Sequence, residues 1–188
     1  MSSGSRETEI KLAVGSAKSA RDLLCAVGFR ISRKRVFESN VVFDTADLLL
    51  RNSGRLLRVR EAGRRSTVTY KGVARPGRHK SREEIETEIA GALELTSIFG
   101  NLGFVPIFRY EKYRTEYRKG HRGGVAMLDE TPIGVYLELE GAPPWIDSTA
   151  RRLGFGRKDY ITVSYGSLYF QWCEGRGEHP THMVFRGR

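Results

Sequence analysis

The sequence lacks long hydrophobic runs, and cysteine and proline are scarce in it. No stretch approaches the roughly 18 consecutive apolar residues that a membrane-spanning helix needs, so we expect a soluble protein. The first ten residues, MSSGSRETEI, lack the basic and apolar regions of a secretory signal, which favours a cytoplasmic location. Cys25 and Cys173 lie too far apart in the sequence to suggest a zinc knuckle or a redox pair, and we expect both thiols to be buried.

Charge, in contrast, is abundant and unbalanced. The 188 residues include 32 Lys and Arg against 22 Asp and Glu, which gives a formal net charge of +10. Such an excess favours an anionic partner, and nucleic acid, an anionic membrane surface or a polyphosphate would each satisfy it. The length suits a single domain, and no repeat or interdomain linker is visible.

Two hydrophobic periodicities divide the chain. Helical spacing with suitable caps predicts helices at 16–27, 91–102, 143–153 and 164–173. Alternation with period 2 predicts eight or nine strands, at 6–14, 36–45, 54–62, 65–73, 81–90, 108–118, 124–130, 134–140 and 158–165. The pattern is typical of an α+β protein, with a mostly antiparallel sheet or barrel and flanking helices. Residues 173–188 have the composition of a basic, flexible tail.

The charged residues repeat along one face of several predicted strands, because residues of equal parity on a strand point the same way. A solvent-exposed face is one explanation. The close like-charge pairs favour another, in which the sheet closes into a barrel with these faces inward, so that carboxylates bind divalent cations and basic groups bind phosphate oxygens. The residues are Glu7, Glu9, Lys11, Arg58, Arg60, Lys71, Glu84, Glu86, Lys112, Arg114, Asp129, Glu138 and Glu140.

The charge balance of this set supports an inward-facing site. Seven of its members are acidic and six are basic. Two divalent cations would add four positive charges, and a triphosphate would bring about four or five negative ones. The lumen therefore stays close to neutral when metal and triphosphate bind together, but not when either binds alone.

The order of these motifs also resembles a known family. Glu7-Thr8-Glu9-Ile10-Lys11 is similar to the ExExK signature of the CYTH family, the triphosphate tunnel metalloenzymes, which include class IV adenylyl cyclases, thiamine triphosphatases and inorganic triphosphatases. The resemblance covers about residues 5–172 and continues through VFDT at 42–45, LRVR at 57–60, YKG at 70–72, SREEIE at 81–86, EKYR at 111–114, LDE at 128–130, LELE at 137–140 and SY at 164–165.

The resemblance implies an eight-stranded antiparallel β tunnel, open at both ends, that binds a triphosphate with Mg²⁺ or Mn²⁺. It implies metal binding by Glu7, Glu9, Glu84, Glu86, Asp129, Glu138 and Glu140. It implies triphosphate binding by Lys11, Arg58, Arg60, Lys71, Lys112 and Arg114, and a direct part in catalysis for Glu7, Glu9, Lys11 and Asp129. The tunnel domain would span residues 5–172, followed by the tail at 173–188.

Three functions are compatible with these residues. Metal-dependent hydrolysis of tripolyphosphate, thiamine triphosphate or a nucleoside triphosphate is favoured, because six basic residues account for phosphate recognition and no comparable set accounts for adenine. An adenylyl cyclase that converts ATP to cyclic AMP and pyrophosphate is the alternative, with Arg33, Lys34 and Arg35 or the aromatic Tyr110 and Tyr113 at a tunnel mouth. The third is a non-catalytic binder of polyphosphate or nucleic acid, which the aligned carboxylates disfavour. The oligomeric state is left open, and a homodimer is compatible with the sequence.

Overall fold

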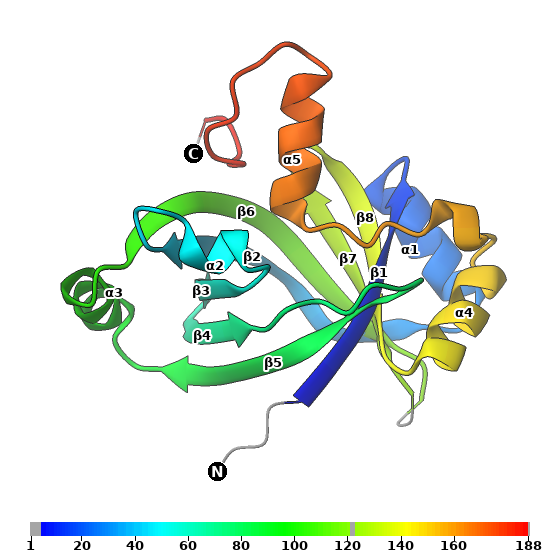
Figure 1. The fold of residues 1–188 in the computed structure, drawn as a ribbon. Coiled ribbons are helices and arrows are strands. Elements are labelled where there is room, and N and C mark those ends of the chain that lie inside the picture. The colour runs from blue at the N-terminus through cyan, green and yellow to red at the C-terminus, as the bar shows by residue number, and fades with distance from the viewer. Residues whose placement is uncertain (1–4, 121–122, 188) are drawn as a thin grey trace.

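The computed structural model of the chain describes residues 5–120 and 123–187 and shows a closed barrel of eight antiparallel strands (Figure 1). Around the barrel, the strands follow the order β1-β5-β4-β3-β2-β6-β7-β8. The predicted α+β class and the eight-stranded antiparallel barrel with flanking helices are therefore confirmed. The strands are β1 (Ser5–Val14), β2 (Arg30–Asp44), β3 (Leu56–Ala62), β4 (Arg65–Lys71), β5 (Lys80–Ile89), β6 (Val105–Arg118), β7 (Val125–Thr131) and β8 (Gly134–Glu140).

The four predicted helices are present, and two of them begin at a serine that caps the helix. The Ser16 hydroxyl accepts a hydrogen bond from the Ser19 N–H at the start of α1 (Ala17–Ala26), and Ser164 caps α5 (Tyr165–Glu174) in the same way. The other two are α3 (Ala92–Asn101) and α4 (Pro143–Arg152). In addition, the short helix α2 (Leu49–Asn52) and the 3₁₀ helix η1 (Arg157–Asp159) occur.

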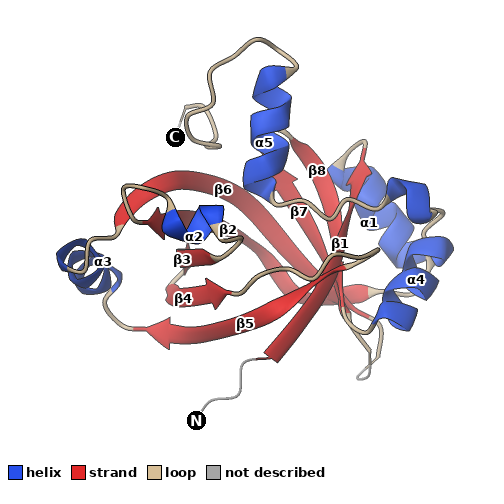
Figure 2. Cartoon of the chain, viewed as in Figure 1, coloured by secondary structure: helices blue, strands red, loops and turns tan. Residues whose placement is uncertain are grey.

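The ninth candidate strand, residues 158–165, is not a strand. It begins in η1 and then runs extended, with a single bridge between Ile161 and Lys11 on β1. Figure 2 shows α1 and α4 on one side of the barrel, α3 on the other, and α5 standing above one end. The loop before α5 thus carries the chain across the mouth of the barrel.

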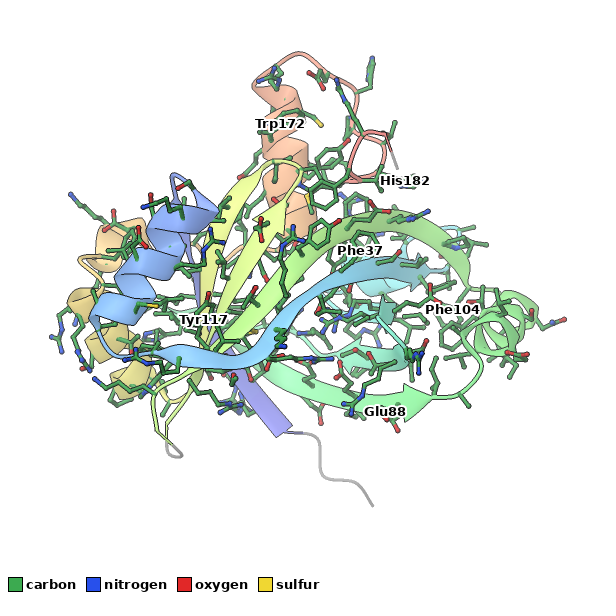
Figure 3. The ribbon with its side chains drawn as sticks, turned by 180° about the vertical axis from the view of Figure 1, so that it is seen from behind. Phe37, Glu88, Phe104, Tyr117, Trp172 and His182 are labelled. Atoms are coloured by element: carbon green, nitrogen blue, oxygen red, sulfur yellow. The ribbon has the colours of Figure 1, made fainter. Side chains whose placement is uncertain are left out.

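The apolar core lies outside the barrel rather than within it. Outward-facing Ile10, Leu12 and Leu137 are fully buried against the inner faces of α1 and α4. Tyr117 belongs to the same cluster (Figure 3). Each such side chain stabilises the fold by roughly 1.5 to 3 kcal/mol. Cys25 was expected to be buried but is exposed, because it lies on α1 away from this cluster. Among the residues described, no helix has the length and apolar character needed to cross a membrane.

The end of the chain lies along β6, although the sequence predicts a flexible tail. The β7 strand pairs with β6 only at residues 113–117, which leaves the preceding edge of β6 open. Met183 occupies this edge: its N–H donates to the Arg109 carbonyl at 3.0 Å, and its carbonyl accepts from the Glu111 N–H at 2.8 Å. Met183 is fully buried, and the neighbouring His182 lies beside the same strand (Figure 3). Arg188 lies outside the described residues.

Candidate active site

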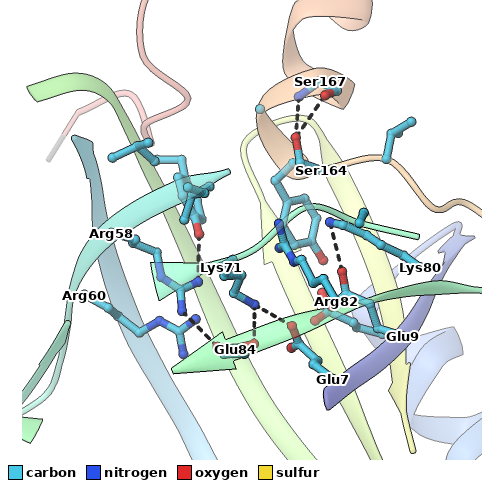
Figure 4. A pocket seen from close by; sticks show the side chains of 18 of the residues that line it. Glu7, Glu9, Arg58, Arg60, Lys71, Lys80, Arg82, Glu84, Ser164 and Ser167 are labelled. Carbon is cyan, nitrogen blue, oxygen red and sulfur yellow. Dashed lines mark hydrogen bonds and ion pairs between the residues drawn. The ribbon is translucent and has the colours of Figure 1, made fainter. Parts of the chain in front are cut away.

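The interior of the barrel is a cavity of about 1360 Å³ to which all eight strands contribute side chains (Figure 4). Every predicted site residue lines this cavity except Asp129. Alternation along each strand explains the arrangement, since the residues of one parity pack outside and those of the other parity point inward. The cavity thus gathers the predicted acidic and basic residues into one chamber.

The acidic residues cluster where β1 lies beside β8. Glu9 is in register with Glu140. Burial, together with the nearby carboxylates of Glu7, Glu138 and Glu9, raises the pKa of Glu140 to about 7. Burial also raises the pKa of Glu7, as does its hydrogen bond with Glu84. These carboxylates therefore repel one another, and additional positive charge would stabilise them.

Lysine side chains supply part of that charge. The Lys71 ammonium lies between Glu7 and Glu84, 2.7 Å from an oxygen of each (Figure 4). Glu9 is paired with Lys11 and Lys80, both at 3.2 Å. Although burial acts to raise the pKa of Glu9, these lysines hold it well below its usual value.

The acidic cluster has the donor chemistry that a divalent cation requires. Carboxylate oxygens are the preferred ligands of Mg²⁺ and Mn²⁺. Burial raises the pKa of Glu140, and its carboxylate neighbours contribute to the same shift, so a cation at this point would stabilise the ionised cluster. Within residues 5–120 and 123–187, no three His, Cys, Asp or Glu side chains already stand in a metal-binding arrangement. Residues of this type fit a hard cation, provided that the lysine ammonium groups move aside.

The basic residues are held in place by fixed hydrogen bonds on the opposite wall. Arg58 donates to the Thr69 hydroxyl at 3.0 Å and to the Tyr110 hydroxyl at 3.2 Å, and it lies 3.4 Å from Glu86. Arg60 donates to the side-chain oxygen of Asn40 at 3.0 Å. Rotamers fixed in this way reduce the entropy cost of binding an anion.

Asp129 lies behind the basic wall. It is fully buried, and its oxygens accept hydrogen bonds from Lys112 at 2.9 Å, from Arg114 at 2.7 and 2.6 Å, and from the Tyr165 hydroxyl at 2.7 Å. Burial opposes ionisation, but Arg114 and Lys112 hold the pKa of Asp129 well below its usual value. In this arrangement Asp129 orients two of the phosphate-binding candidates.

Several lumen residues were missed at the sequence level. The clearest is Glu38, which is buried between Arg60 at 3.6 Å and Lys112 at 3.7 Å. Burial acts against its ionised form, yet Lys112, Arg114 and Arg60 lower its pKa to about 2. Alternation along ESNVVFD could have revealed it, since Glu38 shares a face with Asn40. The others are Lys80, Arg82 and Tyr165, all of which line the cavity.

The residues predicted for a tunnel mouth separate into two groups. Arg33 and Tyr110 line the cavity. Arg35 and Tyr113 instead stack on each other outside the barrel, with the guanidinium carbon 3.4 Å from the ring centroid, and Arg35 also pairs with Glu130. Parity explains the difference, because Tyr113 alternates with the inward-facing Lys112 and Arg114.

Comparison with known proteins agrees with this architecture. The family model of the CYTH domain matches residues 5–165. The chain belongs to the CYTH family. A protein of Methanocaldococcus jannaschii named "Putative adenylate cyclase" is 32% identical to this CYTH protein over 135 residues, which cover 71% of this chain and 75% of the relative.

Solved structures share the CYTH fold. A structure described as a putative adenylate cyclase from Vibrio parahaemolyticus has a TM-score of 0.74 at 19% identity, covering 88% of this chain and 98% of that one. A Hippeastrum protein, described as a putative adenylyl cyclase with a dominant triphosphatase activity, has a TM-score of 0.66 at 22% identity, covering 93% and 97%. At these identities the likeness shows the fold alone.

Proposed function

We propose that this CYTH protein hydrolyses a triphosphate inside the barrel with the help of a divalent cation, Mg²⁺ or Mn²⁺. The observation that carries the proposal is the composition of the single chamber, in which a basic wall faces a cluster of mutually repelling carboxylates. Such a chamber is complementary to a phosphate chain together with a cation, and to neither alone. The chemistry of the triphosphatase reported for the Hippeastrum protein agrees with this assignment.

The basic residues bind and orient the phosphate chain. Lys11, Arg58 and Arg114 are buried and point into the cavity, so their charges act where little water screens them. Phosphoryl transfer depends mostly on positioning and on electrostatic stabilisation, which these fixed cations provide. Arg60 and Lys112 also line the cavity, and Lys71 reaches it from between Glu7 and Glu84.

The acidic cluster would hold the cation. Glu7, Glu9, Glu138 and Glu140 would bind it, with Glu84 and Glu86 beside them on β5. A bound divalent cation supplies charge neutralisation on the phosphate chain and lowers the pKa of a coordinated water. Asp129 and Glu38 keep the adjacent basic residues oriented through the ion pairs described above.

An adenylyl cyclase is the second candidate. The name of the Methanocaldococcus jannaschii relative favours it, and the cavity of about 1360 Å³ exceeds what a triphosphate alone requires. In that reaction the ribose 3′-oxygen attacks the α-phosphorus, and pyrophosphate leaves.

The deciding experiment is a product assay. The enzyme is incubated with tripolyphosphate, thiamine triphosphate and ATP in Mg²⁺ or Mn²⁺, and phosphate, pyrophosphate and cyclic AMP are separated by chromatography. We expect phosphate release that excess chelator abolishes. Cyclic AMP as the main product, with tripolyphosphate untouched, would favour the cyclase. Tight binding of tripolyphosphate without turnover in either metal would contradict both enzymatic functions.

A further inference from the structure

The cavity does not account for the positive charge of the chain. Among the described residues, the charged side chains that line it, together with Asp129 and Glu38 behind its wall, are twelve basic and ten acidic residues. The chain as a whole has a formal net charge of +10, so most of the excess lies elsewhere. The exterior therefore offers a second place where negative charge can bind.

The first part of β2 has an unpaired edge. On one side, β2 pairs with β6 from Arg30 onward, but on the other side β3 pairs with it only over residues 38–43. Within the described chain, no other strand and no isolated bridge occupies that side of residues 30–36. In Figure 3 this part of β2, in light blue, passes below α1. Alternate residues of a strand direct their N–H and C=O groups to the same edge, so this edge offers unpaired donors and acceptors.

Basic side chains surround the unpaired edge. Arg30 and Lys34 lie on β2 itself, whereas Lys119 follows β6 and Arg152 ends α4. Lys119 and Arg152 converge on the carbonyl of Val27, which accepts hydrogen bonds from them at 2.8 and 3.0 Å. All four basic side chains are exposed, and none forms an ion pair with a described acidic residue. We call Arg30, Lys34, Lys119 and Arg152 the basic edge.

Two acidic residues beside this part of β2 are already paired with other arginines. Arg33 lies 3.4 Å from Glu116 on β6, and Arg35 lies 2.8 Å from Glu130 on β7. These ion pairs leave the four charges of the basic edge without compensation. Ile31 lies on the same strand and is 57% exposed, so the edge also offers an apolar contact.

The chemistry of the unpaired edge selects among anionic partners. Its donors alternate with acceptors, and another polypeptide strand is complementary to both. The phosphate groups of nucleic acids and lipids accept hydrogen bonds but donate none, so they would leave the carbonyl groups of the edge unpaired. A second copy of this chain would bring the same four positive charges to the contact and would be repelled.

We propose that the basic edge binds an extended, acidic segment of a partner protein, which adds to β2 as a further strand. Backbone hydrogen bonds to residues 30–36 hold the segment, and its carboxylates pair with the four basic side chains. The charges that keep two copies apart are thus the charges that recognise the partner. None of these four side chains lines the cavity, so binding of the partner is measured independently of triphosphate hydrolysis.

Binding of a defined peptide tests the proposal. The probe is a fluorescein-labelled octapeptide of alternating glutamate and valine, and fluorescence anisotropy measures its binding to the full chain. Mg²⁺ and the bis(methylene) analogue of tripolyphosphate are present in excess, so that the basic residues of the cavity are occupied. We expect saturable binding. The same octapeptide with every backbone nitrogen methylated keeps its charge but has no N–H donors, and its Kd should be at least about 10-fold higher.

Variants and hydrogen exchange locate the site on the protein. Arg30→Gln/Lys34→Gln should raise the Kd of the octapeptide about 5-fold, because two surface charge contacts are lost. Arg176→Gln/Arg186→Gln removes the same charge from exposed positions at the chain end and should leave the Kd unchanged. In the parent, the amides of residues 30–36 that face away from β6 should exchange more slowly when the octapeptide is bound.

Several results would overturn the proposal. Equal Kd values for the two octapeptides, or for the parent and Arg30→Gln/Lys34→Gln, would show that no strand is added at the basic edge. Slower exchange confined to other segments would place the peptide elsewhere. Tighter binding of a short single-stranded RNA or of phosphatidylserine vesicles would assign the edge to another class of partner. Failure to hydrolyse any triphosphate would instead contradict the proposed function and leave these binding results unaffected.

Discussion

Glu9 and Glu140 face each other across β1 and β8, yet their surroundings differ. Glu9 is stabilised as an anion by Lys11 and Lys80, whereas burial and neighbouring carboxylates destabilise the anion of Glu140 and raise its pKa to about 7. Simple repulsion among the acids would make every one of them dispensable for folding. Glu140 fits this expectation, because burial and neighbouring carboxylates disfavour its charge. Glu9 does not, because Lys11 and Lys80 stabilise its charge.

Paired substitutions should therefore have opposite effects on stability. Glu9→Gln should lower the free energy of unfolding by about 3 kcal/mol, since it leaves buried lysines without their partner. Glu140→Gln should leave it unchanged or increase it at pH 8, because it removes a charge that its neighbours repel. Urea denaturation in excess chelator measures both values.

The rate of phosphate release shows whether Glu9 and Glu140 act in the site as well as in the stability of the fold. Both variants should lose most of the Mg²⁺-dependent phosphate release, because both remove an oxygen from the acidic cluster. A stable Glu9→Gln protein with the parental rate would contradict the ion-pair network and the site together.

Tyr110 should ionise at an unusually low pH. Burial opposes ionisation, but Arg58, Lys112 and Arg60 lower the pKa of this phenol to about 8. Ultraviolet absorbance of the phenolate should show a transition near pH 8 that Tyr110→Phe abolishes. Tyr113→Phe, which changes the outward-facing neighbour, is the matched control and should retain the transition.

The same pKa predicts a stability effect with a definite sign. An unfolded tyrosine titrates near pH 10. Because the folded pKa is lower, the phenolate stabilises the fold fully above pH 10, and this contribution is lost as the pH falls from about 10 through 8. The free energy of unfolding of the parent should rise relative to that of Tyr110→Phe as the pH increases from 8 to 10. If the two proteins show the same pH dependence of this free energy, the lowered pKa of Tyr110 is contradicted.

At the scale of elements, the chain end covers the open edge of β6 through a single backbone bridge at Met183. An open strand edge exposes unpaired N–H and C=O groups, and residues 182–185 cover it. The segment also supports Phe108 and Tyr110 from outside, through the cluster that contains Met183 and Tyr169. Its backbone hydrogen bonds join Met183 to Arg109 and Glu111, the residues on either side of Tyr110.

Met183→Ala should destabilise the protein by about 2 to 5 kcal/mol, since it leaves a cavity where a fully buried side chain stood. Arg186→Ala, an exposed change in the same segment, should cost less than about 0.5 kcal/mol. Thermal and urea denaturation provide the comparison. Equal stability of the two variants would mean that the chain end does not contribute to the fold in solution.

At the scale of the whole molecule, the barrel encloses nearly balanced opposite charges, and this balance is kept when a cation and a phosphate chain bind together. Mg²⁺ and the bis(methylene) analogue of tripolyphosphate should together raise the melting temperature more than the sum of their separate effects, because each offsets the charge that the other brings. Binding at 100 times Kd stabilises by about 2.7 kcal/mol. Sodium chloride of equal ionic strength is the control. Additive shifts would contradict a shared site.

Local pattern was sufficient to predict most of the elements. Alternation, helical spacing and the cap at Ser16 located the strands and helices, and parity assigned Glu7, Arg58 and Lys71 to faces that line the cavity. The same parity could have identified Glu38, which was overlooked. These features depend only on neighbours in the sequence, since period and capping are local properties.

Tertiary structure decided the rest. The segment at 158–165 alternates like a strand, but it crosses the barrel mouth and meets β1 in a single bridge, between Ile161 and Lys11. Met183 has no strand pattern around it and is buried because β7 leaves the edge of β6 open. Closure of the barrel determined which charges lie close together. Glu9 is paired with Lys80 as well as Lys11, whereas the neighbours of Glu140 are mostly carboxylates. Long-range pairing sets these environments, and no single segment of the sequence contains the information that specifies them.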